Sequence, residues 1–204
     1  ANGARGTIRG LMRSLLKHWF KAIFLYPKHH IGVGNDHYEA YWEERGKTGL
    51  NLSPWQKERS DIVRAFVDEQ KDAIFTVTDI GCGDGAVLAY LRGYYPNLKG
   101  TGIDFSDAVL RFAKEAGFET RAIDFSNPEK LEIPETDYVI LFETIEHIAN
   151  SELLVTKAFE KVKKAVFISI PNTGFFTYRL RLLLGKFPAQ WVDQPNEHLR
   201  FWTV

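Results

Sequence analysis

The chain has little cysteine and no apolar run long enough to cross a bilayer. Its single cysteine, Cys82, excludes a disulfide framework, which fits a reducing compartment and predicts a cytoplasmic protein. Internal repeats and low-complexity tracts are also missing. With 204 residues, of which 45% are apolar, the chain can build a sizeable core, and we expect one domain with an appendage.

Acidic residues are missing from the first 30 positions, which hold six of the 26 Lys and Arg residues. The remainder therefore carries 20 basic and 26 acidic residues, a balance of −6. Because phosphate binding needs basic surface, this acidic body argues against nucleic acid as the general partner.

Residues 5–26 have apolar side chains at helical spacing and a basic residue every four positions, which predicts an amphipathic helix. Packing on the domain, a dimer interface and contact with an anionic membrane surface all stay open for this helix. We therefore divide the chain into residues 1–30 and a domain over residues 31–204, with a peripheral membrane location as one alternative.

The most informative stretch runs from Ile74 to Asp104. A β-branched run that contains Asp79 leads into a glycine-rich turn, Gly81–Gly85, and a helical stretch from Ala86 to Tyr94 follows. A second short strand then ends in Asp104. Such a strand–turn–helix–strand unit, with an acid about twenty residues beyond the glycines, is typical of a site for an adenosine-bearing cofactor.

The spacing D-x-G-x-G-x-G differs from the dinucleotide pattern G-x-G-x-x-G. Acids at Asp79 and Asp84 suit a ligand with a positive amine and sulfonium better than one with phosphates. The letters D-I-G-C-G-D-G and G-I-D-F-S resemble the first two motifs of class I S-adenosylmethionine (SAM) methyltransferases. The resemblance implies SAM as the cofactor and covers residues 53–171.

Strands and helices alternate along the rest of the chain. Further strands are expected at 118–123, 137–142 and 165–170, with helices at 54–69, 107–116 and 151–163. This order predicts an α/β fold with a doubly wound, mostly parallel, Rossmann-like sheet. The family that the chain resembles has seven strands, and the sequence shows no pattern for the last two.

Ligands of open α/β sheets bind at the carboxyl ends of the strands. By resemblance, Asp104 binds the ribose hydroxyls and Asp124 accepts from the adenine amino group, although a turn cap stays open for Asp124. The other cofactor-binding positions implied by the resemblance lie at the same strand ends: Asp79, Gly81, Cys82, Gly83, Phe105, Phe125 and Phe142.

E-T-I-E-H follows the fourth strand and brings two carboxylates and an imidazole together. If a helical turn begins at Glu143, that residue and Glu146 share a face, with His147 beside them. These three residues with His198 form a candidate site for Mg²⁺ or Zn²⁺. The element resembles that of ubiquinone-biosynthesis O-methyltransferases and of small-RNA 2′-O-methyltransferases. A metal-free general base at His147, helped by Glu143, and a structural role both stay open.

Residues 173–191 are apolar and basic, and we expect either a lid over the active site or plain packing. Around residues 165–200 the chain resembles MetW-type proteins, which are methyltransferase-like partners in methionine biosynthesis. The function that we expect is O-methylation of a small-molecule, sugar or isoprenoid/lipid-linked acceptor. A MetW-like regulatory partner and an RNA 2′-O-methyltransferase are the alternatives.

Overall fold

The computed structural model describes residues 13–21, 23–25, 50–70, 72–188 and 198–203. The chain divides into two compact units, which are described separately. We call Gly32–Ile170 the sheet unit. Ala1–Ile31 together with Pro171–Val204 form the helical unit.

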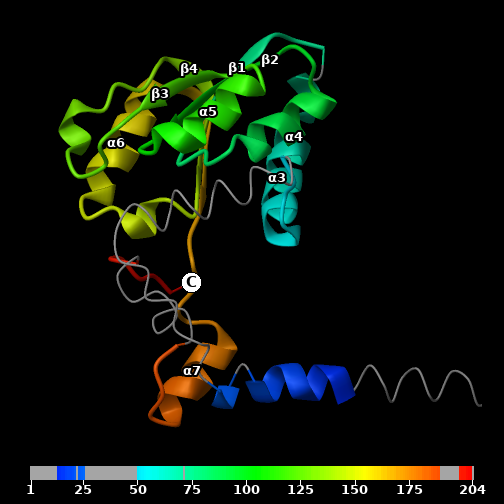
Figure 1. The fold of residues 1–204 in the computed structure, drawn as a ribbon, viewed down its shortest axis with the longest axis vertical. Helices are drawn as coiled ribbons and strands as arrows, with labels where there is room; N and C mark the ends of the chain where they lie inside the picture. Colours follow the sequence, from blue (N-terminus) through cyan, green and yellow to red (C-terminus); the bar gives the residue numbers. More distant parts are fainter. Residues whose placement is uncertain (1–12, 22, 26–49, 71, 189–197, 204) are drawn as a thin grey trace, which may run out of the picture. The chain divides into compact units, whose positions relative to one another are not determined.

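The sheet unit alternates helices and strands as the sequence predicts (Figure 1). Its described elements, in chain order, are α3 (Pro54–Val67), η1 (Asp68–Gln70), β1 (Phe75–Ile80), α4 (Ala86–Tyr94), β2 (Leu98–Asp104), α5 (Asp107–Glu115), β3 (Glu119–Ala122), η2 (Pro128–Lys130), β4 (Thr136–Phe142), η3 (Ile145–His147), α6 (Ser151–Lys161) and β5 (Val162–Ser169).

The five strands form one sheet in the order β3-β2-β1-β4-β5, and every neighbouring pair is parallel. This confirms the predicted doubly wound fold. The chain runs outward from β1 to β3 and then returns to the other side of β1 as β4. The carboxyl ends of β1 and β4 are therefore neighbours at the point where strand order reverses, which is where open α/β sheets bind ligands. The part of the chain that the structure describes supplies no sixth or seventh strand.

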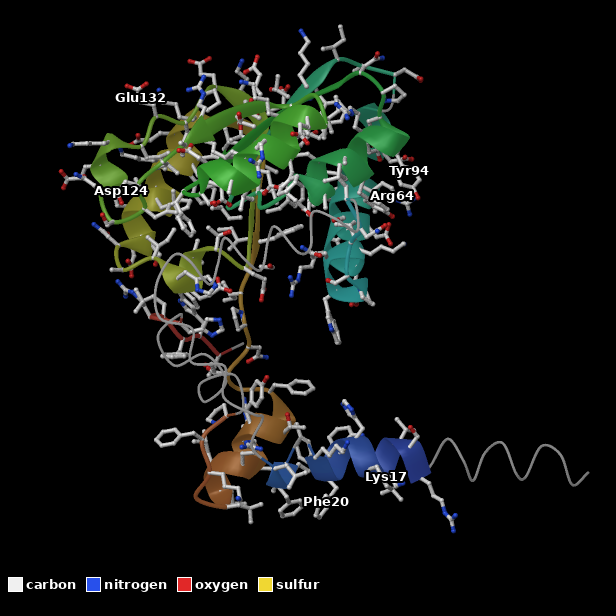
Figure 2. All side chains as sticks on the ribbon, in the orientation of Figure 1. Lys17, Phe20, Arg64, Tyr94, Asp124 and Glu132 are labelled. Carbon is white, nitrogen blue, oxygen red and sulfur yellow. The ribbon has the colours of Figure 1, made fainter. Side chains whose placement is uncertain are left out.

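Helix α3 begins at a capping box formed by Ser53 and Gln56. The Ser53 hydroxyl accepts from Gln56 N at 3.2 Å, and the Gln56 side chain accepts from Ser53 N at 3.0 Å. Figure 2 shows Arg64 of α3 beside Tyr94 of α4, with the guanidinium 4.4 Å from the ring centroid. Apolar residues of α3 and α4 pack with Phe75 and neighbouring strand residues in one core. Burial of this core fixes α3 next to the sheet.

The helical unit pairs the two ends of the described chain. Residues 13–21 and 23–24 are helical, and α7 spans Phe176–Leu183. Residues 5–12 of the predicted amphipathic helix lie outside the described residues. None of the described helices has both the length and the apolar content needed to cross a membrane.

Arg181 of α7 is fully buried and links the two parts of the helical unit. Its guanidinium donates to Phe187 O at 2.7 Å, to Ile23 O at 3.2 Å and to Leu25 O at 2.9 Å. The carbonyls near the end of the N-terminal helix thus receive a cation, the favourable charge at that helix end. The division predicted from the sequence, at residue 30, stays a prediction. By compactness, residues 171–204 group with the N-terminal residues.

Candidate functional site

The turn after β1 is fixed to the end of β2 by backbone hydrogen bonds. Gly81 N and Cys82 N both donate to Ile103 O, at 2.7 and 3.1 Å. Gly81 has φ +79°, and a Cβ there would lie 2.3 Å from the Thr144 hydroxyl oxygen. The close approach of β4 to this turn therefore requires glycine at position 81.

Cys82 is buried within the turn, and burial raises the pKa of its thiol well above the ordinary value. Its sulfur would lie 2.7 Å from a Cβ at Gly102, so the thiol fills space against β2. A protonated, packed thiol is a poor nucleophile. The predicted contact of Cys82 with the cofactor stays a prediction.

Asp104 at the end of β2 is buried and organises the turn. Its Oδ2 accepts from Gly83 N at 3.0 Å, while Oδ1 accepts from Phe105 N at 2.8 Å and Ser106 N at 3.2 Å. Burial raises the pKa of Asp104, and these backbone donors oppose that rise. A carboxylate oxygen can accept two hydrogen bonds, so Oδ2 has capacity for a ligand hydroxyl.

Three buried carboxylates surround the glycine turn: Asp79, Asp84 and Asp104. Burial, together with the nearby Asp104 and Asp84, raises the pKa of Asp79 to about 8. Such a cluster disfavours further negative charge and favours a cation. A glycine cradle among buried acids therefore fits a ligand with sulfonium and ammonium groups better than one with phosphates.

The tips of β1 and β4 are joined by Thr144. Its hydroxyl oxygen lies 2.9 Å from Ile80 O and 3.1 Å from Phe142 O. Thr144 thereby fixes the E-T-I-E-H segment next to the glycine turn. The predicted role of Phe142 at the methionine part of the cofactor stays a prediction.

Asp124 follows β3 and caps the turn after it. Its Oδ1 accepts from Ser126 N at 2.9 Å and from the Ser126 hydroxyl at 2.6 Å, and these bonds lower the pKa of Asp124. It also lines a hollow of about 440 Å³ beside β3, as does Glu132. Figure 2 labels both residues. Nearby, the rings of Phe105 and Phe125 meet edge to face, with centroids 6.3 Å apart. Adenine binding by Asp124, Phe105 and Phe125 stays a prediction.

Glu143 is held at the tip of β4 by two other elements. Arg59 Nη2 of α3 lies 3.2 Å from Glu143 Oε1, and the Ser169 hydroxyl at the end of β5 donates to the same oxygen at 3.1 Å. Its φ of +50° is a strained conformation for a residue with a side chain, and such strain is often found at functional sites.

The helical turn of E-T-I-E-H begins at Ile145 rather than at Glu143. The condition under which Glu143 and Glu146 would share a face, a turn that begins at Glu143, is therefore not met. Because the left-handed backbone of Glu143 precedes η3, Glu143 and Glu146 do not share a helical face.

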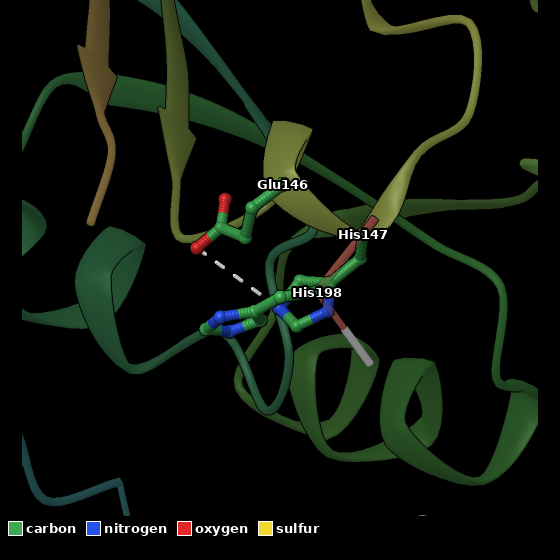
Figure 3. Close-up of side chains that lie close together, drawn as sticks. All are labelled: Glu146, His147 and His198. Carbon is green, nitrogen blue, oxygen red and sulfur yellow. Dashed lines mark ion pairs between the residues drawn. The ribbon is translucent and has the colours of Figure 1, made fainter. Parts of the chain in front are cut away.

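Glu146 and His147 lie side by side on η3 (Figure 3). Glu146 is fully buried, and neither carboxylate oxygen has a hydrogen-bond partner within the described part of the chain. Burial raises the pKa of Glu146 to about 7, and the nearby Glu143 adds to the rise. His147 is exposed, and its Nε2 lies 4.0 Å from Glu146 Oε1. The pair thus places a carboxylate that can accept a proton near neutral pH beside a solvent-accessible imidazole.

The residues of the sheet unit fit a divalent metal poorly. Glu143 Oε1 is already bound by Arg59 and Ser169. Of the E-T-I-E-H side chains that could bind a metal, this leaves Glu146 and His147, which lie next to each other. His198 belongs to the helical unit. The four-ligand site, and the approach of His198 to it, stay predictions, and we derive no chemical step through a metal.

Arg59, Thr144 and Ser169 were missed by the sequence analysis. Ser169 ends β5 and could have been noticed by the rule that placed the other strand-end residues. Arg59 lies within α3 and carries no local signal, because its partner is far along the chain.

The comparisons with known proteins agree with this geometry. The sequence profile of the family described as methyltransferase domain matches residues 37–204. This chain belongs to that methyltransferase domain family. Its predicted membership of the SAM-dependent class is thereby confirmed at the level of family and fold, whereas the MetW-type and ubiquinone-biosynthesis resemblances are not confirmed.

Two curated plant proteins are similar to part of this methyltransferase domain. It is 33% identical over 87 residues to the (S)-tetrahydroprotoberberine N-methyltransferase of Eschscholzia californica, covering 40% of this chain and 25% of the relative. It is 34% identical over 97 residues to the (S)-coclaurine N-methyltransferase of Thalictrum flavum subsp. glaucum, covering 44% of this chain and 26% of the relative. The chain thus spans about a quarter of the length of these relatives.

A solved structure shares the fold of this methyltransferase domain. The plantazolicin methyltransferase BpumL, in complex with a pentazolic desmethylPZN analogue and SAH, matches with a TM-score of 0.53 at 16% identity. The match covers 80% of this chain and 60% of that one. At this identity the likeness supports the Rossmann-like methyltransferase fold and nothing finer.

Proposed function

We propose that this chain is the catalytic domain of a SAM-dependent methyltransferase that methylates the amine nitrogen of a small molecule. The observation that carries the proposal is the buried carboxylate of Glu146, whose pKa is raised to about 7 and whose Oε1 lies 4.0 Å from His147. The curated relatives named as N-methyltransferases favour nitrogen over the oxygen expected from the sequence.

The glycine turn and its acids are the proposed cofactor site. Gly81 leaves room beside Thr144, Asp104 Oδ2 can accept from a ribose hydroxyl, and the acids near Asp79 suit the cationic groups. SAM, when bound, supplies a methyl group on a sulfonium. The protein's contribution is then to align the acceptor atom with that methyl group and to control one proton.

Glu146 suits an amine because most alkyl amines are protonated at neutral pH and must lose a proton before they react. Its carboxylate is fully buried, so the proton of the ammonium group passes to it through the exposed imidazole of His147, and a pKa near 7 allows both states of Glu146 near neutral pH. The nitrogen lone pair then forms the new bond to the methyl carbon as the sulfur–methyl bond breaks, with its electron pair left on sulfur. The sheet unit, which holds 16 basic and 24 acidic residues, also attracts cations.

Transfer to oxygen is the second candidate. His147 is exposed beside a carboxylate, the arrangement of a base that could take the proton of a hydroxyl group. The relatives named above do not support the RNA or MetW-like alternatives.

The test is product formation with matched amine and phenol acceptors, followed by mass spectrometry of the methylated product and of S-adenosylhomocysteine. We expect N-methylated product, with a rate that rises with pH through an apparent pKa of about 7.

Glu146→Gln should lower the rate about 100-fold or more, whereas Glu152→Gln, at an exposed position, should not lower it. Because Glu143 is held by Arg59, a chelator should leave the rate unchanged. Methylation of hydroxyl groups alone would reject the nitrogen proposal.

A further inference from the structure

The two units carry opposite charge. The helical unit contains ten Lys and Arg residues and two acids, a balance of +8, and the sheet unit has a balance of −8. Within the described residues of the helical unit there are seven basic residues and no acid. A charge difference of this size within a neutral chain gives the helical unit a surface that attracts anions.

The same unit exposes large apolar side chains. On the N-terminal helix, these are Leu15, Leu16, Trp19, Phe20, Phe24 and Leu25, each 40–65% exposed. On and around α7, they are Phe175, Phe176, Leu182, Leu183, Leu184 and Phe187, each 47–81% exposed. Figure 2 shows Lys17 and Phe20 on the same helix, which illustrates the mixture of charge and apolar surface.

The two apolar segments are joined into one body. Arg181 ties α7 to Ile23 O and Leu25 O, and the rings of Trp19 and Phe176 meet edge to face with centroids 6.0 Å apart. Arg181 is used in this internal link, and the exposed basic side chains of the unit include Lys17, Lys21 and Arg179. The pair is therefore preorganised, so little ordering is needed when it binds.

We propose that the N-terminal helix and α7 together form a surface that binds an anionic lipid bilayer, with the helices lying in the interface. Basic residues near large exposed apolar residues are the composition of interfacial helices. Nucleic acid would use the charge, but it would leave twelve large aliphatic and aromatic side chains without a partner. A second copy of the chain would cover the apolar groups but would bring two +8 units together, which electrostatic repulsion opposes.

Vesicle co-sedimentation of the full chain tests this proposal. We expect binding to phosphatidylcholine vesicles that contain phosphatidylglycerol, weak binding to phosphatidylcholine alone, and loss of binding as salt rises. Lys17→Gln with Lys21→Gln should weaken binding about 30-fold, since each basic residue near the surface contributes about fivefold. Equal binding to both kinds of vesicle would overturn the proposal.

Apolar contributions are tested with a matched pair of double variants. Leu16→Gln with Leu183→Gln removes two exposed apolar groups without changing charge, and it should weaken vesicle binding by roughly tenfold or more. Ile74→Gln with Phe159→Gln removes groups that are 70% and 60% exposed on the sheet unit and should have no effect. An equal loss of vesicle binding in both double variants would contradict a lipid-binding surface that is specific to the helical unit.

Two further measurements distinguish the other partners. Anisotropy with labelled RNA and duplex DNA should show no binding at physiological salt, and tight binding there without vesicle binding would overturn the lipid assignment. Light scattering after size exclusion should give the same mass for wild type and for the Leu16→Gln, Leu183→Gln variant. A dimer that this variant dissociates would assign the apolar surface to a second copy instead.

Discussion

Arg59 and Glu143 form an ion pair that links helix α3 to the tip of β4, with 3.2 Å between Nη2 and Oε1. Glu143 has a left-handed backbone, and the Ser169 hydroxyl holds the same carboxylate oxygen. Helix α3 and strands β4 and β5 thus meet at Glu143, three residues before Glu146. Under the proposed function, Glu143 positions the end of β4, and Glu146 with His147 takes part in proton transfer.

Breaking the ion pair should affect catalysis more than folding. Arg59→Gln leaves Glu143 without its cation, and we expect the methyl-transfer rate to fall about 10- to 100-fold because small misplacements are costly. The affinity for SAM, measured by calorimetry, should stay unchanged. Arg64→Gln on the same helix, where the side chain lies over Tyr94, is the matched control. Equal losses in both variants would mean that α3 matters only for folding.

Asp104→Asn should weaken SAM binding. Hydrogen bonds to a charged group contribute about 1.5–3 kcal/mol, so the dissociation constant should rise roughly 10- to 150-fold in calorimetry. Thermal unfolding without ligand measures the separate effect on the turn, because Asp104 also accepts from Gly83 N. Asp107→Asn, at the start of α5, is the control. Unchanged affinity in Asp104→Asn would remove this residue from the cofactor site.

Glu146 should make stability fall as pH rises. Its pKa is raised to about 7 in the folded protein, from an ordinary value of 4.5, so the folded state binds more protons than the unfolded state between about pH 4.5 and 7. The free energy of unfolding therefore falls across that window, by at most about 3 kcal/mol from this group.

Glu146→Gln removes this titration, and denaturant unfolding of wild type and variant at several pH values measures the difference. The variant should gain stability relative to wild type as pH rises from 5 to 8. Asp79, with a pKa raised to about 8, acts in the same direction in both proteins, so it cancels in the comparison. Parallel pH profiles would show that Glu146 is not desolvated in solution.

Two glycine substitutions should have opposite effects on stability. Gly81→Ala places a Cβ 2.3 Å from the Thr144 hydroxyl oxygen at φ +79°, and it should destabilise the fold by about 2–5 kcal/mol. Gly93→Ala in α4 has nothing within 4 Å and should stabilise by up to about 1 kcal/mol. Urea unfolding measures both. A neutral Gly81→Ala variant would show that β4 does not press against the turn.

The sequence predicted local elements well and long-range contacts poorly. Helix α4 has the predicted bounds, because its start and its end depend on neighbouring residues. The sequence left the start of η3 open, because nothing in the E-T-I-E-H pattern indicates the left-handed backbone of Glu143. The link from Arg59 to Glu143 joins residues far apart in the chain, so no periodicity reveals it.

Arg181 has a consequence for the order in which the chain is assembled. Its carbonyl partners, Ile23 and Leu25, lie 158 and 156 residues before it. During synthesis at about 5–20 residues per second, the N-terminal helix is therefore made roughly 8–30 seconds before the cation that caps its end. Throughout that interval the apolar side chains of the N-terminal helix have no α7 to pack against. The sheet unit lies between these two segments in the chain, so it is synthesised before the N-terminal helix can reach its contacts with α7.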